Sequence, residues 1–194
     1  ARGAVHHEAA QDRSTRFRGP GHPRVEGGPE GLPAPLAGVA VRLVDLDLVN
    51  PYFRTREART QLSDIGVEVV LPAERYIHAD LPILSRTVGG TIRSPADLTI
   101  LDVGGDDVGA RVLSALAESF SGVSFRMLQV VNPFRPQTAT REGFLKIKSE
   151  IERASRLSIT GLIGNANLID ETTPEIIEEG YVFLSDISRQ FGIP

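Results

Sequence analysis

Three carboxylates in this sequence stand where short apolar runs end. Asp45 and Asp47 close the run "VRLVDLD", and Asp102 is the second-last residue of "LTILDV", a run that two glycines follow. A carboxylate that ends a buried strand can hold Mg²⁺ through water, while a following glycine lets the loop approach a phosphate. We therefore expect chemistry that involves a cation or an activated water.

The elements that position these acids follow from the order of apolar runs and amphipathic segments. Strands are predicted at 39–46, 67–71, 98–103, 125–131 and 159–164. Helices are predicted near 55–65, 80–88, 107–120, 137–155 and 173–190. Continuous apolar strands that alternate with helices predict an α/β fold, a doubly wound, mostly parallel sheet flanked by helices. Sites in such sheets lie at the carboxyl ends of the strands, where the three acids fall.

The loops after the strands also have a purely structural interpretation. In "VGGDDVGAR", Asp106 or Asp107 is expected to cap the helix that follows. Asn165 and Asn167 in "GNANL" offer amide groups able to read a base edge. Asparagine is also a common turn residue. When the loop is considered alone, a turn explains these two asparagines better than recognition of a base does.

Composition limits the classes of function. The chain has 194 residues, 41% of them hydrophobic and 24% charged, which predicts one globular domain. Its net charge of -4 gives no direct nucleic-acid signal, and the lack of cysteine excludes disulfides, thiolate metal sites and a cysteine nucleophile. No apolar run approaches the ~18 residues of a transmembrane segment, and no signal peptide is visible. The expected location is the cytoplasm.

Residues 1–38 differ in composition from residues 39–194. They hold three of the four histidines and seven of the nineteen glycines, and their few large apolar residues follow no helical or strand period. Such a stretch buries too little apolar surface to offset the entropy of ordering it. We expect a disordered tail or, as the favoured interpretation, a non-native segment translated from a shifted reading frame. The histidines lack the spacing of a metal site.

The segment "LDVGGDDVGA" also resembles the glycine motif of methyltransferases that use S-adenosylmethionine. That function predicts an acid at the end of the next strand, where it would bind the ribose hydroxyls. The next strand, "FRMLQVVN", ends instead in Asn132, and the glycine spacing differs from G-x-G-x-x-G. Both departures count against this alternative.

Four segments together carry a more specific resemblance: "VDLDLVNPYF", "LDVGGDDVGA", "VVNPFRPQT" and "GNANL". They resemble the MinD/ParA/CobQ-type branch of P-loop nucleotide hydrolases, in particular the MinD-like ATP-binding proteins with D-x-D-x-x-N-P-Y-F-R and D-V-G-G-D. The resemblance covers residues 39–194. It implies a P-loop NTPase-like fold, with ATP and Mg²⁺ as ligands.

The resemblance also implies a role for each candidate residue. Asp47 matches the aspartate that positions the attacking water, and Asp45 matches the preceding acid near Mg²⁺. Asp102 matches the Walker B aspartate, which belongs to the metal's shell. Asn165 matches the asparagine that contacts adenine, with Asn167 as a second candidate at that place.

One departure concerns the phosphates. The family begins with a strand, a glycine-rich G-K-[ST] loop and a helix, and this loop and its lysine cradle the phosphates. The sequence contains no G-K-[ST], and its only lysines, Lys146 and Lys148, lie inside a predicted helix. By the resemblance, the missing strand and loop belong where residues 1–38 stand.

We therefore expect a MinD-like ATPase that binds and hydrolyses Mg-ATP in its intact form and is impaired in this chain. A nucleotide-dependent homodimer or an unidentified protein partner would be coupled to the reaction. The alternative is a non-hydrolytic scaffold or interaction module on the same fold. Relatives that resemble cobyrinic acid synthase or dethiobiotin synthase, which use the same nucleotide chemistry on small acids, also stay open.

Overall fold

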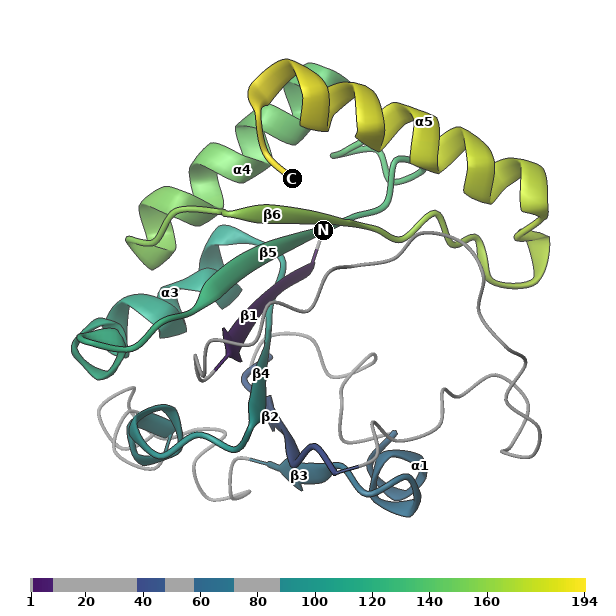
Figure 1. The fold of residues 1–194 in the computed structure, drawn as a ribbon. Coiled ribbons are helices and arrows are strands. Elements are labelled where there is room, and N and C mark those ends of the chain that lie inside the picture. The colour runs from purple at the N-terminus through teal and green to yellow at the C-terminus, as the bar shows by residue number, and fades with distance from the viewer. Residues whose placement is uncertain (1, 9–37, 48–57, 72–87) are drawn as a thin grey trace.

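The computed structural model describes residues 2–8, 38–47, 58–71 and 88–194, with residues 2–8 described as backbone. Six strands form one sheet in the order β3-β2-β4-β1-β5-β6 (Figure 1). The strands are β1 (Arg2–Glu8), β2 (Val41–Asp45), β3 (Glu68–Val70), β4 (Leu98–Val103), β5 (Arg126–Val131) and β6 (Gly161–Gly164). The last five agree with the five predicted strands.

Most strand pairs in the sheet are parallel. β2 pairs in parallel with both β3 and β4, and β5 pairs in parallel with β6. α1 lies between β2 and β3 along the chain, and α4 lies between β5 and β6, so these two parallel pairs are connected through helices, as such pairs require. The predicted α/β class with parallel strands flanked by helices is confirmed.

β1 differs from the expectation, because it lies in the segment for which we predicted no regular structure. It runs antiparallel between β4 and β5, with Gly3 opposite both Val103 and Gln129. A strand in this place bonds to its neighbours through its backbone, which any sequence without proline can do. Side-chain patterns therefore do not reveal it. Residues 9–37 lie outside the described part of the chain, and the expectation for them stays a prediction.

The helices agree with the prediction where the structure describes them. They are α1 (Arg59–Asp64), α3 (Asp107–Ala115), α4 (Arg141–Ser155) and α5 (Pro174–Phe191), with the short helices η2 (Ala117–Phe120) and η3 (Ile169–Glu171). Residues 88–93 are also helical, and most of the helix predicted at 80–88 lies outside the described residues. Thr140 and Thr173 cap the starts of α4 and α5, and the left-handed residues Arg156 and Gly192 end them.

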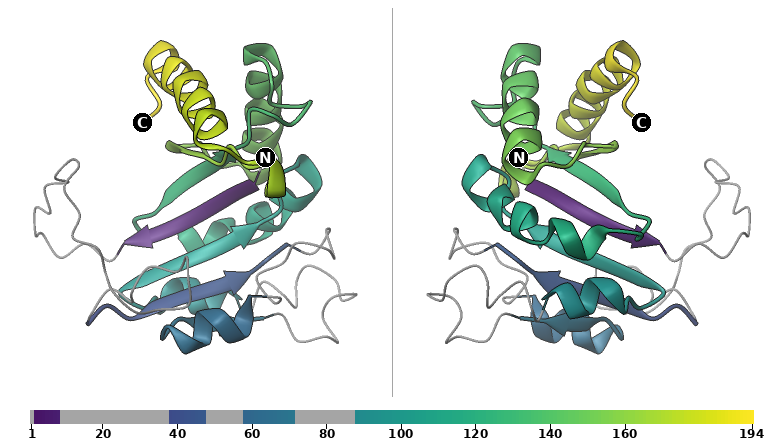
Figure 2. Two further views of the ribbon diagram at one scale, coloured as in Figure 1. Left: turned by 90° about the vertical axis from the view of Figure 1, so that its right-hand side faces the viewer. Right: turned by 90° about the vertical axis from the view of Figure 1, so that its left-hand side faces the viewer.

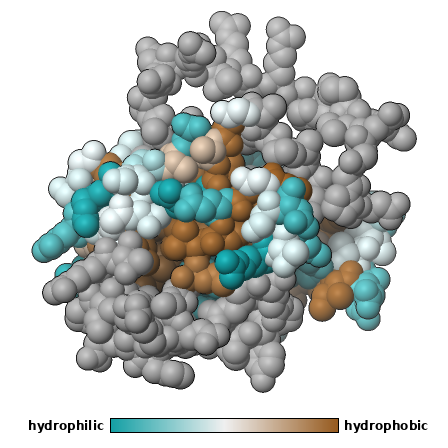
Figure 3. All heavy atoms as spheres, turned by 90° about the horizontal axis from the view of Figure 1, so that it is seen from below, coloured by the Kyte–Doolittle hydropathy of each residue, from teal (hydrophilic) through white to brown (hydrophobic). Residues whose placement is uncertain are grey.

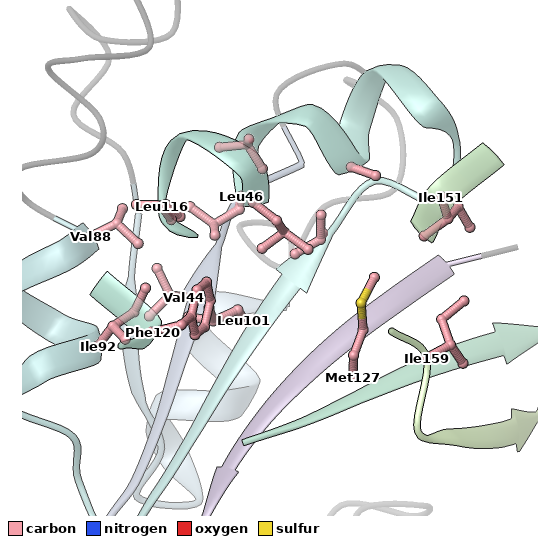
Figure 4. Close-up of a cluster of buried hydrophobic side chains, with 14 residues drawn as sticks. Val44, Leu46, Val88, Ile92, Leu101, Leu116, Phe120, Met127, Ile151 and Ile159 are labelled. Atoms are coloured by element: carbon pink, nitrogen blue, oxygen red, sulfur yellow. The ribbon is translucent and has the colours of Figure 1, made fainter. Parts of the chain in front are cut away.

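The main core lies between the sheet and the layer formed by α3, α4 and residues 88–93 (Figure 2). Figure 4 shows Val44 and Leu101 from the sheet beside Phe120 and Ile92 from helical segments. Each of these four side chains is buried. Burying apolar side chains of this size supplies most of the free energy that holds such layers together.

The opposite face of the sheet is apolar as well. Leu43, Ile100 and Val130, which alternate with buried core residues along their strands, are half-buried. Apolar residues also gather in the middle of the molecule's lower side, next to hydrophilic ones (Figure 3). Strands with two apolar faces explain why the sequence shows continuous apolar runs instead of alternation.

A smaller core fixes α5 beside β6. Val131, Phe144 and Ile187 are buried together, with Leu184 of α5 packed against them. Gly180 lets the helix approach the loop after β6, because a Cβ at that position would lie 2.3 Å from the Cβ of Ala166. The first half of α5 is thereby held against the "GNANL" loop.

Candidate functional site

The structure brings the three predicted aspartates to one end of two neighbouring parallel strands. Asp45 and Asp102 are register partners on β2 and β4, and the Leu46 N–H donates a 2.7 Å hydrogen bond to the Asp102 carbonyl oxygen. Asp45 is fully buried and Asp47 is 5% exposed, while Asp102 is half-buried. The strand-end argument placed these acids at one edge, and they lie there.

Asp45 shapes the backbone that carries Asp47. The Asp47 N–H donates a 3.1 Å hydrogen bond to Oδ1 of Asp45. This is a local turn in which an aspartate side chain bonds the backbone two residues further on. The two acids of "DLD" are therefore coupled: Asp45 holds the turn from which the Asp47 side chain extends.

Asp47 reaches the loop that follows β4. Its Oδ1 atom lies 3.3 Å from the position that a Cβ on Gly104 would occupy. The same Cβ would lie 2.9 Å from the Cα of Gly109, so the loop also packs closely on the start of α3. Gly104 and Gly109 thus let two backbone segments meet beneath the Asp47 carboxylate. The sequence signal for this contact was the glycine pattern of "GGDDVG", to which we gave only an approach to phosphate.

The start of α3 is occupied by acids. Asp106 accepts a 2.7 Å hydrogen bond from the Gly109 N–H, which confirms the predicted cap. Asp107 lies in the first turn and forms a 3.3 Å ion pair with Arg111. A phosphate at a helix start is bound by free N–H groups and by the positive end of the helix. Here the Asp106 carboxylate uses the Gly109 N–H, and Asp107 adds a second negative charge, so the start of α3 disfavours a phosphate.

On the other side of β1, the strand ends carry amides that hold loops together. The Asn132 Nδ2 donates to the Asn167 carbonyl oxygen at 2.8 Å, and Oδ1 of Asn132 accepts from the Phe134 N–H at 3.0 Å. Both polar groups of this buried side chain are thus used by backbone partners. Asn132 joins the loop after β5 to the loop after β6.

Asn167 has a similar structural task. Its Oδ1 accepts hydrogen bonds from the Ile169 N–H at 2.7 Å and from the Thr172 hydroxyl at 3.2 Å. Asn165 is exposed, and within the described residues no hydrogen bond reaches its side chain. Among the described residues, both polar atoms of the Asn165 side chain are available to a ligand, whereas Oδ1 of Asn167 is used to order the loop beside it.

The carboxylate oxygens at this edge of the sheet are better suited to a Mg²⁺ ion than to the phosphates of a nucleotide. Within the described part of the chain, no three His, Cys, Asp or Glu side chains form a group that could hold a metal alone. Mg²⁺ is usually bound by one or two carboxylates with waters and substrate phosphates, and the half-buried Asp102 offers such a carboxylate. Asp45 is fully buried, and its Oδ1 already accepts the Asp47 N–H. Neither lysine of the chain supplies the phosphate-binding lysine at this edge, because both lie on α4 and Lys148 is paired with Glu152 at 2.7 Å.

The direction of β1 determines at which edge of the sheet this strand ends. Gly3 pairs with Val103 at the carboxyl end of β4, whereas Glu8 pairs with Leu98 at its amino end. The carboxyl end of β1 therefore lies at the edge opposite the three aspartates. A strand of the opposite direction in this place would deliver its following loop to the aspartates.

Comparisons with protein-family models, with curated proteins and with solved structures found no match. Among the helices that the structure describes, none is long and apolar enough to cross a membrane. The functional assignment therefore depends on the residues and geometry given above.

Proposed function

We propose that this chain carries the metal and water half of a Mg-ATP site of the MinD/ParA type, within a P-loop NTPase-like fold. One observation carries the proposal: Asp47 from the loop after β2 reaches Gly104 after β4, beside the register partners Asp45 and Asp102. Acids from two neighbouring strands and from the loop after one of them, which converge at the carboxyl edge of a parallel sheet, are the arrangement expected of a nucleotide site.

Each residue then has a distinct task. Asp102 and Asp45 offer oxygen ligands to Mg²⁺, which neutralises phosphate charge when it is bound. Asp47 orients a water for in-line attack on the terminal phosphoryl group, from a turn that Asp45 holds in place. Asn165 contacts the base, and Asn167 keeps the base-binding loop ordered through Ile169 and Thr172.

Hydrolysis needs a phosphate-binding loop as well. The sequence contains no G-K-[ST], so we expect hydrolysis only in a form of the protein that supplies such a loop from a strand parallel to β4 and β5. In this chain, the triphosphate would meet three carboxylates with only Mg²⁺ between them. We expect this chain to bind Mg-ATP weakly or not at all.

A non-hydrolytic scaffold is the second candidate. The antiparallel direction of β1 and the acids at the start of α3 favour it, because neither offers a phosphate site. A scaffold would keep the fold and have no need of ATP in any form.

Calorimetry with Mg-ATP separates the two candidates. The chain as it stands is compared with a form in which a strand, a G-K-[ST] loop and a helix precede Val39. The proposal predicts micromolar affinity and Mg²⁺-dependent turnover in the second form alone. If the second form folds but neither binds nor hydrolyses ATP, the proposed ATP site is wrong and the scaffold remains as the candidate function.

A further inference from the structure

The first half of α5 exposes three large apolar side chains. Ile177 is 55% exposed, Tyr181 is 70% exposed and Val182 is 53% exposed. Ile177 and Tyr181 are one helical turn apart, as are Glu178 and Val182, so these four residues cover one stretch of the helix surface. We call Ile177, Glu178, Tyr181 and Val182 the outer face of α5.

Gly180, Leu184 and Ile187 form the side of α5 that packs on the smaller core. Ile177 lies at the border of that side, one turn before Gly180, and Tyr181 and Val182 lie progressively farther from it around the helix. A single exposed apolar residue is normal on a protein surface, but three within two turns of one helix form a continuous patch. Tyrosine in particular is enriched where proteins bind one another, because its large ring has a polar tip.

The segment of the chain that contains this patch carries one sign of charge. Residues 157–188 contain six acids and no lysine, arginine or histidine. The acids are Asp170, Glu171, Glu175, Glu178, Glu179 and Asp186. The closest bases in sequence are Arg156 before the segment and Arg189 after it, and Arg189 is paired with Asp186. An apolar patch within a segment of six negative charges favours partners that are both apolar and positively charged.

We propose that the outer face of α5 binds a basic amphipathic helix of a protein partner. Apolar side chains of the partner would cover Ile177, Tyr181 and Val182, and its lysines or arginines would flank them and meet the surrounding acids. Anionic lipids and nucleic acids are repelled by the same acids. A second copy of this face would place acids against acids. The proposal stands apart from the nucleotide site and does not require it.

A synthetic peptide tests the surface directly on the full chain. The probe is an amphipathic helix of leucine and lysine of roughly 18 residues, about five turns, with one tryptophan as reporter. The chain has no tryptophan, so the fluorescence change reports the peptide alone. We expect saturable binding that weakens with salt. A peptide with glutamate in place of lysine and a scrambled peptide of the same composition are expected not to bind.

Variants locate the binding site. Tyr181→Ser should weaken the probe's affinity about tenfold, as loss of a central anchor does, and Glu178→Lys should weaken it to a similar degree. Val108→Ser and Glu118→Lys are the matched controls, because both residues are exposed on other helices. The controls should leave the affinity unchanged, and circular dichroism should show that all four variants are folded.

Several results would overturn the proposal. It fails if the probe does not bind, if the scrambled or acidic peptide binds equally well, or if Val108→Ser weakens binding as much as Tyr181→Ser. It also fails if vesicles rich in phosphatidylserine bind the chain more tightly than the probe does. A loss confined to Tyr181→Ser and Glu178→Lys supports it.

Discussion

The sheet edge has two halves, which lie on either side of β1 and end their strands in different polar groups. β2 and β4 end in carboxylates, with Asp45 and Asp47 buried and Asp102 half-buried. β5 and β6 end in amides, where Asn132 gives both of its polar groups to backbone partners. Both halves occupy the edge where α/β proteins build their sites.

The difference shows which polar residues hold loops and which are candidates for chemistry. Asn132 bonds the loop after β6, so its amide stabilises the fold and is not available to a ligand. Buried carboxylates cost free energy in any fold, because charge is removed from water even when hydrogen bonds are formed. Acids that are kept at such a cost, together and at a strand end, are candidates for function.

The largest effect is expected from the carboxylate half. In the form that contains a G-K-[ST] loop, Asp102→Asn should lower both Mg²⁺-dependent ATP affinity and turnover about 100-fold, because we propose this carboxylate as a ligand in the metal's shell. Calorimetry with and without Mg²⁺, together with phosphate release, measures both quantities.

Asp97→Asn is the matched control, because Asp97 precedes the amino end of the same strand, where it accepts a 2.9 Å hydrogen bond from the Ala40 N–H. It should change neither quantity. If the two variants behave alike, the carboxylate edge has no special role.

In the amide half, substitution of Asn132 should lower the stability of the fold and should not act through ligand binding. Asn132→Ala would leave the Asn167 carbonyl oxygen and the Phe134 N–H without their partner, at a cost of about 2–3 kcal/mol in the free energy of unfolding. Urea denaturation of this chain measures the loss. Asn165→Ala serves as the control and should change stability by less than about 0.5 kcal/mol, because the Asn165 side chain is exposed. Equal losses in both variants would remove the distinction between structural and available amides.

A smaller effect is expected at the helix that follows the amide half. Thr173 caps α5, and its side-chain hydrogen bond is the main cause that lowers the pKa of Glu175 below the ordinary value of 4.5, with a backbone hydrogen bond adding to it. Thr173→Ala should cost about 1 kcal/mol at neutral pH.

The pH dependence of this variant follows from the direction of the pKa shift. A group with a lowered folded-state pKa contributes stability above its unfolded pKa and loses that contribution as the pH falls through its folded pKa. The difference between wild type and Thr173→Ala should therefore shrink as the pH falls from neutral through 4.5 and below. Thermal melts over that range check this. A constant difference would show that the hydroxyl caps the helix without acting on Glu175.

Much of the fold followed from the sequence, because side-chain patterns record burial. Continuous apolar runs predicted five strands, and amphipathic segments predicted helices near 137–155 and 173–190, where α4 and α5 lie. β1 could not be predicted in this way, since it is held by backbone pairing with β4 and β5.

The sequence was sufficient to predict at which edge of the sheet the candidate site lies, but not the contacts within the site. The strand-end acids could be placed there, because carboxyl ends of parallel strands meet at one edge. The structural role of Asn132 could not be predicted, because its partner Asn167 lies 35 residues away along the chain. The contact between Asp47 and Gly104 likewise depends on how two loops pack, which their separate sequences do not state.

The most direct test of the proposed site is Asp47→Asn in the form that contains a G-K-[ST] loop. If Asp47 orients the attacking water, turnover should fall at least about 100-fold, while Mg-ATP affinity and the thermal midpoint stay close to the unchanged protein. Single-turnover phosphate release, measured beside calorimetry on the same sample, separates these quantities. Full turnover in Asp47→Asn, or a loss of activity that only follows a loss of stability, would contradict the proposed role.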